Sequence, residues 1–206
     1  MSEVARKRSP RAAYRAPRPA RGDPAQTRER LVAAAAEVFN RDGYDGTDTN
    51  RIAREAGYSP GLFYKHFPDK KAIFLAVYDA WVAEEWRSIE ALLAAPSETT
   101  PRELVATIVA LHRRWRVFRR SLRALAASDA EIKRGHLAGR KRQLDTLARL
   151  RAPHPADRAR DLLLLYTLER AADALAEDEL GALGVPAAAL LALLEQQLAA
   201  ALSART

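Results

Sequence analysis

The residues of this 206-residue chain that are best suited to chemistry follow a glycine turn at Gly57. Ser59 and Pro60 are expected to begin a short helix there, because serine is a favoured N-cap and proline a favoured first helical residue. A short helix that exposes its N-terminus can enter the major groove of DNA and bring backbone amides close to phosphates. The residues that this helix would expose near its start are Pro60, Gly61, Leu62, Tyr64, Lys65 and His66. Their spacing favours contact with nucleic acid; the alternative is an ordinary helical hairpin, since hairpins with a glycine turn are common.

No pattern of a catalytic site accompanies these residues. The sequence contains no nucleophile elbow, phosphate-binding glycine loop, paired-carboxylate motif or metal-ligand spacing. The four histidines, His66, His112, His136 and His154, are too far apart in the sequence to share one helical turn. The absence of cysteine excludes disulfides, thiol nucleophiles and cysteine-ligated metals. The sequence therefore predicts a protein that is not an enzyme and that carries neither a metal nor a cofactor.

The elements that must position the exposed residues are helical throughout, because apolar residues recur at helical spacing from Thr27 onward. The first helix should end at Gly43, and a second, capped by Asp48, should end at Gly57. The third should break at Pro68, after which Asp69 opens a long helix towards Leu93. Further helices are expected at about 102–127, 129–151, 156–178 and 186–203. The fold class is thus all-α, with the second and third helices forming a helix-turn-helix.

The net charge of +8 is distributed unevenly along the chain. Residues 1–26 hold seven basic and two acidic residues, whereas residues 27–81 hold eight of each and are neutral. We expect residues 1–26 to be a disordered basic arm, because they contain several prolines and no apolar periodicity. The arm either follows a nucleic-acid backbone or is only a solubilising extension. No apolar run is long enough to span a bilayer and no secretory signal is present, which predicts a cytoplasmic protein without membrane contact.

The run from Thr27 to Trp81 resembles the DNA-binding domain of TetR-family transcriptional repressors. The motifs that carry the resemblance are AAxxVF at the end of the first helix, Gly43-Tyr44, Ile52-Ala53, Ala56-Gly57, Ser59-Pro60-Gly61, Tyr64, His66-Phe67 and Lys70. The resemblance implies an N-terminal DNA-binding domain over 27–72 and a helical ligand-binding and dimerisation domain over 73–206.

The resemblance also implies a role for each residue of the motif. Pro60, Gly61, Leu62 and Lys65 would face base edges, with Leu62 suited to a thymine methyl and Lys65 to guanine. Tyr64, His66, Lys70, Tyr44 and Thr47 would contact the phosphate backbone. For Leu62 the alternative is inward packing, and for His66 it is a structural hydrogen bond within the helix junction. The residues named for DNA contact are Tyr44, Thr47, Thr49, Asn50, Pro60, Gly61, Leu62, Tyr64, Lys65, His66 and Lys70.

One position departs from the family pattern. Asp48 stands where the family usually has threonine or serine, whose hydroxyl both caps the helix and meets a phosphate. Aspartate caps equally well, but its charge repels a phosphate. Capping is therefore assigned to Asp48, and phosphate contact to Thr47, Thr49 and Asn50.

In the family, the last two helices of each subunit build a four-helix bundle between two copies. Here the helices at about 156–178 and 186–203 fit that role. Their apolar faces comprise Leu162 to Leu165, Leu168, Ala172 and Leu175 on one helix, and Leu190, Leu191, Leu194, Leu198 and Ala201 on the other. The alternative is that these faces form the core of a single chain. A twofold homodimer would read a palindromic DNA site.

The middle helices carry the candidates for a ligand pocket. They are Trp81, Trp86, Trp115, Phe118 and Tyr166, with His112, His136 and Glu169 as polar anchors. The segment 113–123 adds six arginines, of which Arg113, Arg116, Arg120 and Arg123 are expected on one helical face. These arginines either grip an acidic effector or, as we favour, form a salt-bridged face with Glu84, Glu85 and Asp129 as partners.

Three functions remain open from the sequence. The first is a repressor that a small-molecule effector releases from DNA by moving the helix that begins near Asp69. The second is a regulator whose C-terminal domain answers to a protein partner or has no ligand. The third is a small-molecule carrier or enzyme that retains a vestigial helix-turn-helix.

Overall fold

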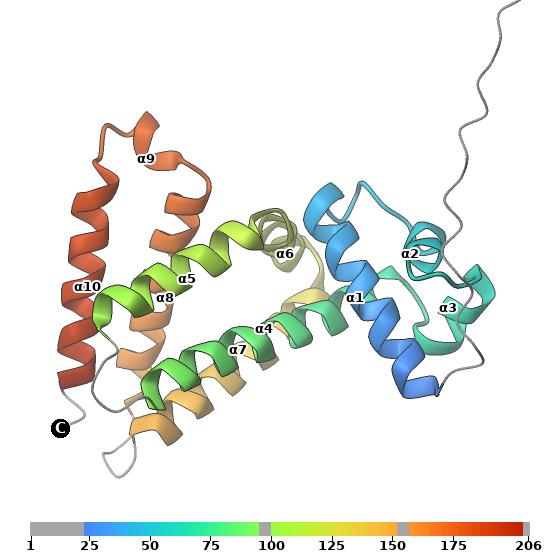
Figure 1. Ribbon diagram of the computed structural model, residues 1–206, viewed down its shortest axis with the longest axis horizontal. Helices are drawn as coiled ribbons and strands as arrows, with labels where there is room; N and C mark the ends of the chain where they lie inside the picture. Colours follow the sequence, from blue (N-terminus) through green and yellow to red (C-terminus); the bar gives the residue numbers. More distant parts are fainter. Residues whose placement is uncertain (1–22, 95–99, 152–156, 204–206) are drawn as a thin grey trace, which may run out of the picture.

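A computed structural model describes residues 23–94, 100–151 and 157–203, and within these ranges every regular element is a helix. Ten helices follow one another along the described chain: α1 Pro24–Asp42, α2 Thr49–Glu55, α3 Pro60–His66, α4 Lys70–Ala94, α5 Pro101–Arg114, α6 Arg116–Ser128, α7 Ala130–Arg151, α8 Arg158–Ala176, α9 Glu179–Ala182 and α10 Ala187–Ser203. Figure 1 shows α1, α2 and α3 gathered at one end of the molecule and α8, α9 and α10 at the other, with α4 running between them. The expected all-α fold is confirmed.

The first helix begins earlier than the sequence indicated. Asp23 is its N-cap and accepts a hydrogen bond from the Ala25 amide, and Pro24 occupies the first helical position. Residues 24–26, which we expected in the basic arm, therefore belong to α1, and the rest of the arm lies outside the described residues. The helix ends where expected, because Gly43 adopts a φ of 76° and donates its amide to the Phe39 carbonyl.

Local signals also place α2, α3 and the start of α4. The Asp48 carboxylate accepts from the Arg51 amide at 2.8 Å, and that of Asp69 accepts from the Ala72 amide at 2.8 Å. Both residues are therefore N-caps, as predicted. Ser59 occupies the N-cap position of α3 but its side chain makes no capping hydrogen bond. That part of the prediction is wrong, and Pro60 is what favours the start of α3 there.

A break at Trp115 divides the helix that was expected over 102–127 into α5 and α6. Trp115 has φ −104° and ψ 16°, outside the helical region, and its side chain is only 7% exposed. Its indole packs at 5.9 Å from the ring of Phe118 and at 6.4 Å from that of Trp81. Burial of this large ring favours the bend over a continuous helix. Arg113 therefore lies on α5, whereas Arg116, Arg120 and Arg123, which we expected on one helix with it, lie on α6.

Two hydrophobic clusters hold the helices together. The larger cluster is formed mainly by residues of α1, α4, α6 and α7, and the smaller mainly by residues of α5, α8 and α10. Close packing of α7 on α4 depends on Gly135 and Gly139, since a Cβ atom added at either position would overlap the side chain of Leu75 or Tyr78. The expected helix at 156–178 is α8, and the short α9 precedes α10 after Asp178, which has a φ of 57°.

Candidate functional site

Helix α3 presents one buried and several exposed side chains. Phe63 is fully buried and anchors the helix on α1 and α2. Leu62 and His66 are half-buried, and the remaining predicted base-facing or phosphate-facing residues of the helix are exposed: Pro60, Gly61, Tyr64 and Lys65. The structure thus brings all the α3 residues named from the sequence to one accessible helix at the end of the molecule (Figure 1).

Gly61 has no structural justification within the chain. A Cβ atom built there would meet no atom within 4 Å, and the residue lies in a helix with ordinary φ. Glycine destabilises a helix relative to alanine by roughly 0.5–1 kcal/mol. The open space at Gly61 leaves the backbone of α3 accessible from outside the chain.

The N-terminus of α2 lies beside α3. The Thr49 hydroxyl and the Tyr64 hydroxyl are 2.8 Å apart, although Tyr64 remains 54% exposed. Asn50 is exposed one residue further along α2. These three polar residues lie beside the end of α2, whose Arg51 amide is already capped by the Asp48 carboxylate.

The turn before α2 is arranged differently from our expectation. The Lys70 ammonium donates to the carbonyl oxygens of Tyr44 at 2.9 Å and Thr47 at 3.0 Å, and it lies 4.0 Å from the centre of the Tyr44 ring. Two of its three donors therefore fix the turn, and one is left for an external anion. Thr47 is only 7% exposed and its hydroxyl is buried without a partner, so the side chain does not reach the surface in this conformation.

Tyr44 joins the DNA-binding half to the rest of the chain. Its half-buried ring packs on Phe39 and Phe74, and burial raises the pKa of its hydroxyl. Its amide donates to the Ser121 hydroxyl on α6 at 3.2 Å. The side-chain amide of Asn40 on α1 donates to the carbonyl oxygen of Arg114, the last residue of α5, and its Oδ1 accepts from the Phe118 amide of α6 at 3.4 Å. The helix-turn-helix is thus tied both to the end of α5 and to α6.

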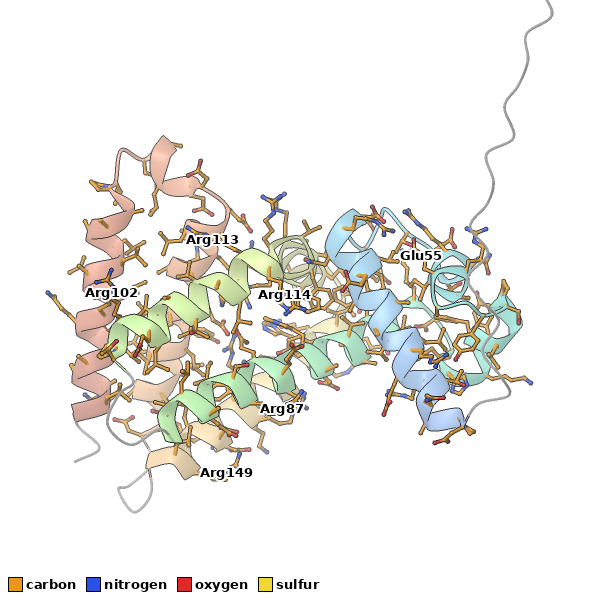
Figure 2. The ribbon with its side chains drawn as sticks, viewed as in Figure 1. Glu55, Arg87, Arg102, Arg113, Arg114 and Arg149 are labelled. Carbon is orange, nitrogen blue, oxygen red and sulfur yellow. The ribbon has the colours of Figure 1, made fainter. Side chains whose placement is uncertain are left out.

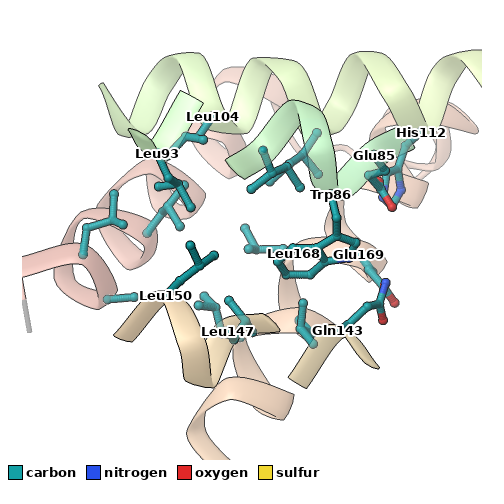
Figure 3. Close-up of a pocket in the computed structure, with 17 residues that line it drawn as sticks. Glu85, Trp86, Leu93, Leu104, His112, Gln143, Leu147, Leu150, Leu168 and Glu169 are labelled. Carbon is teal, nitrogen blue, oxygen red and sulfur yellow. The ribbon is translucent and has the colours of Figure 1, made fainter. Parts of the chain in front are cut away.

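A cavity of about 100 Å³ lies between α4, α5, α7, α8 and α10 (Figure 3). Of the residues that we expected to line a pocket, Trp86, His112 and Glu169 do so. Phe118 is fully buried against Phe74, and Tyr166 is 51% exposed on the surface. The apolar residues of the lining are Ile89, Leu93, Leu104, Ile108, Leu147, Leu150, Leu164, Leu165, Leu168, Leu198, Ala201 and Leu202.

The other residues expected at a ligand pocket do not line this cavity, and two polar residues were missed. Trp81, His136 and Tyr166 line a second pocket, which Glu169 and Gln143 also border. Trp115 packs in the core against Trp81 and Phe118. Glu85 and Gln143 do line the cavity. No local signal marks them, since a single charged or amide residue on a long helix is most often exposed.

A buried ion-pair network adjoins the polar end of the cavity. The Nδ1 atom of His112, on α5, is hydrogen-bonded to the Asp173 carboxylate of α8 at 2.8 Å. Arg119 of α6 donates to the same carboxylate at 2.7 Å. Arg123 also pairs with Asp173 and with Glu177. Burial opposes ionisation of Asp173, but its hydrogen bonds to His112 and Arg119 outweigh burial and lower its pKa.

The arginine-rich segment is therefore a salt-bridged face, as we favoured, but with different partners. Arg119 and Arg123 pair with α8, whereas Glu85 faces His112, and Asp129 pairs with Lys71. Of the partners that we expected, only Glu84 pairs with an arginine of the segment, Arg114, at 3.8 Å. Arg113 and Arg114 are exposed at the end of α5 (Figure 2).

The two carboxyl groups of the cavity differ in their partners. Glu169 forms a bidentate ion pair with Arg140, at 2.8 and 2.5 Å, which outweighs burial and lowers the pKa of Glu169. Glu85 is 5% exposed and lies 3.9 Å from the His112 Nε2. Burial raises the pKa of Glu85 to about 7, and burial likewise lowers that of His112. Perturbed ionisable groups that line a cavity mark a candidate ligand site.

The described residues offer neither a membrane span nor a metal cluster. Among the described residues, no helix is long and apolar enough to cross a membrane. The same part of the chain holds no cluster of three or more histidine, aspartate or glutamate residues arranged to bind a metal. An exposed recognition-type helix at one end and an apolar cavity with a polar end at the other define a helix-turn-helix protein with a helical C-terminal domain.

Comparison with known proteins shows what the N-terminal helices are similar to. Residues 31–77 match the model for bacterial regulatory proteins of the tetR family. The chain is 41% identical over 71 residues to the HTH-type transcriptional regulator HbdR of Aromatoleum sp. strain CIB, covering 32% of this chain and 31% of that protein. It is 29% identical over 86 residues to the HTH-type transcriptional regulator YerO of Bacillus subtilis, covering 39% and 30%. The chain thus matches less than a third of the length of these relatives.

The fold extends the likeness beyond the matched domain. A transcriptional regulator from Rhodococcus sp. Rha1 superposes with a TM-score of 0.62 at 21% identity, covering 86% of this chain and 96% of that one. The match to the tetR-family model is therefore confined to the N-terminal helices, and the described chain shares the all-helical fold of the Rhodococcus regulator.

Proposed function

We propose that this chain is a DNA-binding transcriptional regulator, and specifically a repressor that binds a palindromic operator as a homodimer and is released by a small molecule. The observation that carries the DNA-binding part is Gly61 on the exposed surface of α3, where open space in the free chain leaves room for close approach of a DNA backbone. The names of the matched relatives as HTH-type transcriptional regulators support the same function.

The homodimer is proposed through α8 and α10, with Leu163 from the set first expected and with Leu193, which that set did not include. Leu165, Leu168 and Leu194 are buried within the single chain and belong to its own core. Leu163 and Leu193 are 64% and 61% exposed on the same two helices. Contact between two copies through these exposed leucines would remove apolar surface from water.

The release mechanism is proposed to pass through α6 as well as α4. His112 at the cavity pairs with Asp173, and Asp173 holds Arg119 of α6. Helix α6 in turn contacts Tyr44 through Ser121. A ligand that changes the position of His112 would shift α6, the turn before α2 and hence the separation of the two α3 helices in the dimer.

Selection of bound sequences from random DNA, with the full chain, tests the DNA-binding function. We expect enrichment of a twofold-symmetric sequence with half-sites about one helical turn (roughly 34 Å) apart. Lys65→Ala should relax the preference at one base position of each half-site, at a cost of about 1–3 kcal/mol. Arg113→Ala, an exposed arginine far from α3, is the matched control and should bind like the parent chain. Recovery of sequences without any common motif would refute the proposal.

The contribution of the basic arm is measured in the same experiment with a chain that lacks residues 1–22. This boundary keeps the Asp23 cap of α1 intact. If the arm contacts phosphates, the truncation weakens binding and lowers the slope of affinity against salt. An unchanged slope means that the arm has no part in binding.

A further inference from the structure

The cavity has one polar end and one apolar end. Figure 3 shows Glu85, His112 and Gln143 on one side, with Leu93, Leu104 and Leu150 across the cavity from them. A ligand that fills it must therefore be amphipathic, with a polar head at the Glu85 end and an apolar body among the leucines.

The polar end supplies hydrogen-bond acceptors. The Nδ1 of His112 donates to the Asp173 carboxylate, which leaves Nε2 of the neutral ring as an acceptor facing Glu85 at 3.9 Å. The Oε1 atom of Gln143 is buried without a hydrogen-bond partner. The Glu85 carboxyl forms no hydrogen bond with the residues that the structure describes, although it is 95% buried. Buried polar groups are normally satisfied, so these groups call for a donor from outside the chain.

No cation of the described chain fills that role, because neither lysine nor arginine is among the residues that line the cavity. The two nearest guanidinium groups are engaged elsewhere. Arg119 is held by Asp173, and Arg140 is held by Glu169 through two hydrogen bonds.

We propose that the cavity binds a protonated amine with an apolar body, whose ammonium group pairs with Glu85. The Gln143 carbonyl and His112 Nε2 supply further acceptors at the same end, and the leucines enclose the alkyl or aryl group. Trp86 lines the same region and presents an aromatic ring to the cation. The proposal rests on the function proposed above in taking this cavity as the effector site, and it names the chemical class of that effector.

Two other ligand classes fit less well. A carboxylate would meet Glu85 and Glu169 with no free guanidinium to balance them. A hydrocarbon would fill the apolar end but leave Gln143 and Glu85 buried without partners, which is costly in a dry cavity.

The test is calorimetric titration of the full chain at pH 8, without DNA, with straight-chain ammonium ions of four to eight carbons. The corresponding alcohols and carboxylates are the matched probes. We expect the ammonium ion of the best-fitting length to bind at least about tenfold more tightly than its alcohol, as a charged hydrogen bond requires. Each added methylene should strengthen binding about fourfold until the cavity is full. Equal binding of ammonium, alcohol and carboxylate, or no ammonium binding at all, would overturn the proposal.

Two variants locate the ammonium group. Glu85→Gln keeps the side-chain volume and should weaken ammonium binding at least about tenfold while leaving alcohol binding within about threefold. Glu84→Gln is the control, because Glu84 directly precedes Glu85 on α4 but has a side chain that is 49% exposed. If Glu85→Gln, folded by circular dichroism, binds the ammonium ion as tightly as the parent, the cation does not sit at Glu85 and the inference fails.

Operator affinity is measured in a separate experiment, with and without the ammonium ion. If the chain binds the ammonium ion and its affinity for the selected operator does not change, the ligand class is confirmed and release from DNA by that ligand is refuted. A chain that binds no ammonium ion but still selects an operator refutes only the ligand class.

Discussion

The buried carboxyl group of Glu85 should make the free protein less stable as the pH rises, and Glu85→Gln should remove that loss. Burial raises the pKa of Glu85 from 4.5 to about 7 in the folded chain. Between these two pH values the folded chain keeps the proton while the unfolded chain releases it. The contribution of the group to stability is therefore complete below about pH 4.5 and is lost as the pH rises through about 7.

The size of the effect follows from the shift. One pKa unit corresponds to about 1.4 kcal/mol. Part of the loss of stability has already occurred at pH 5, because the unfolded carboxyl is half-ionised near pH 4.5. Relative to the parent, Glu85→Gln should thus gain about 2 to 3 kcal/mol in free energy of unfolding between pH 5 and pH 8. The groups whose charges act on Glu85 are Arg119, Arg140, Glu169 and Asp173, with His112 at 3.9 Å, and all remain in the variant.

Urea denaturation of both chains at several pH values, at one fixed protein concentration, measures this gain. Glu84→Gln is again the control, and its effect on stability should be small and nearly independent of pH. A Glu85→Gln variant that is less stable than the parent at pH 8 would show that the carboxylate is already paired with a cation in the free protein. That result would also remove the reason for a cationic ligand.

Three further substitutions test other parts of the structure. Gly61→Ala should stabilise the free chain by about 0.5 kcal/mol in urea denaturation but weaken operator binding in fluorescence anisotropy, whereas Gly181→Ala, also open in the structure, should leave DNA binding unchanged. Asp173→Asn should lower the free energy of unfolding by about 3 kcal/mol, because it leaves a buried arginine unpaired; an unchanged urea midpoint would contradict the network. Gly139→Ala should destabilise by about 1–3 kcal/mol, seen as a lower melting temperature, because the added methyl overlaps Tyr78.

The DNA-binding half could be predicted in detail because its signals are local. A cap such as Asp48, a stop such as Gly43 and a proline at the first helical position each act within one helical turn, so the sequence states them directly. The motif also named the exposed residues of α3. What it did not reveal is that Thr47 is buried and that Lys70 holds the turn, since both depend on how α4 packs against that turn.

The ligand half could be predicted only as a set of helices. The polar end of the cavity is built from residues 85, 112, 143 and 169, each on a different helix, and no spacing in the sequence connects them. The bend at Trp115 was missed for a similar reason. It carries no proline or glycine signal, and what favours it is the burial of one indole against Trp81 and Phe118, which are brought together only by tertiary packing.

Whether the cavity favours an anion or a cation depends on both the arginines of the 113–123 segment and the buried acidic residues. Six arginines in eleven residues suggested an anion as strongly as a salt-bridged face. In the structure, Arg119 and Arg123 form ion pairs with Asp173, and Arg123 also pairs with Glu177. These ion pairs link α6 to the end of α8. Inside the cavity, the unpaired charge is negative, because Glu85 is a carboxyl group there without a guanidinium partner among the described residues. An excess of positive charge along the chain is thus compatible with a binding site that selects cations, because selection depends on which charges remain unpaired where the ligand sits.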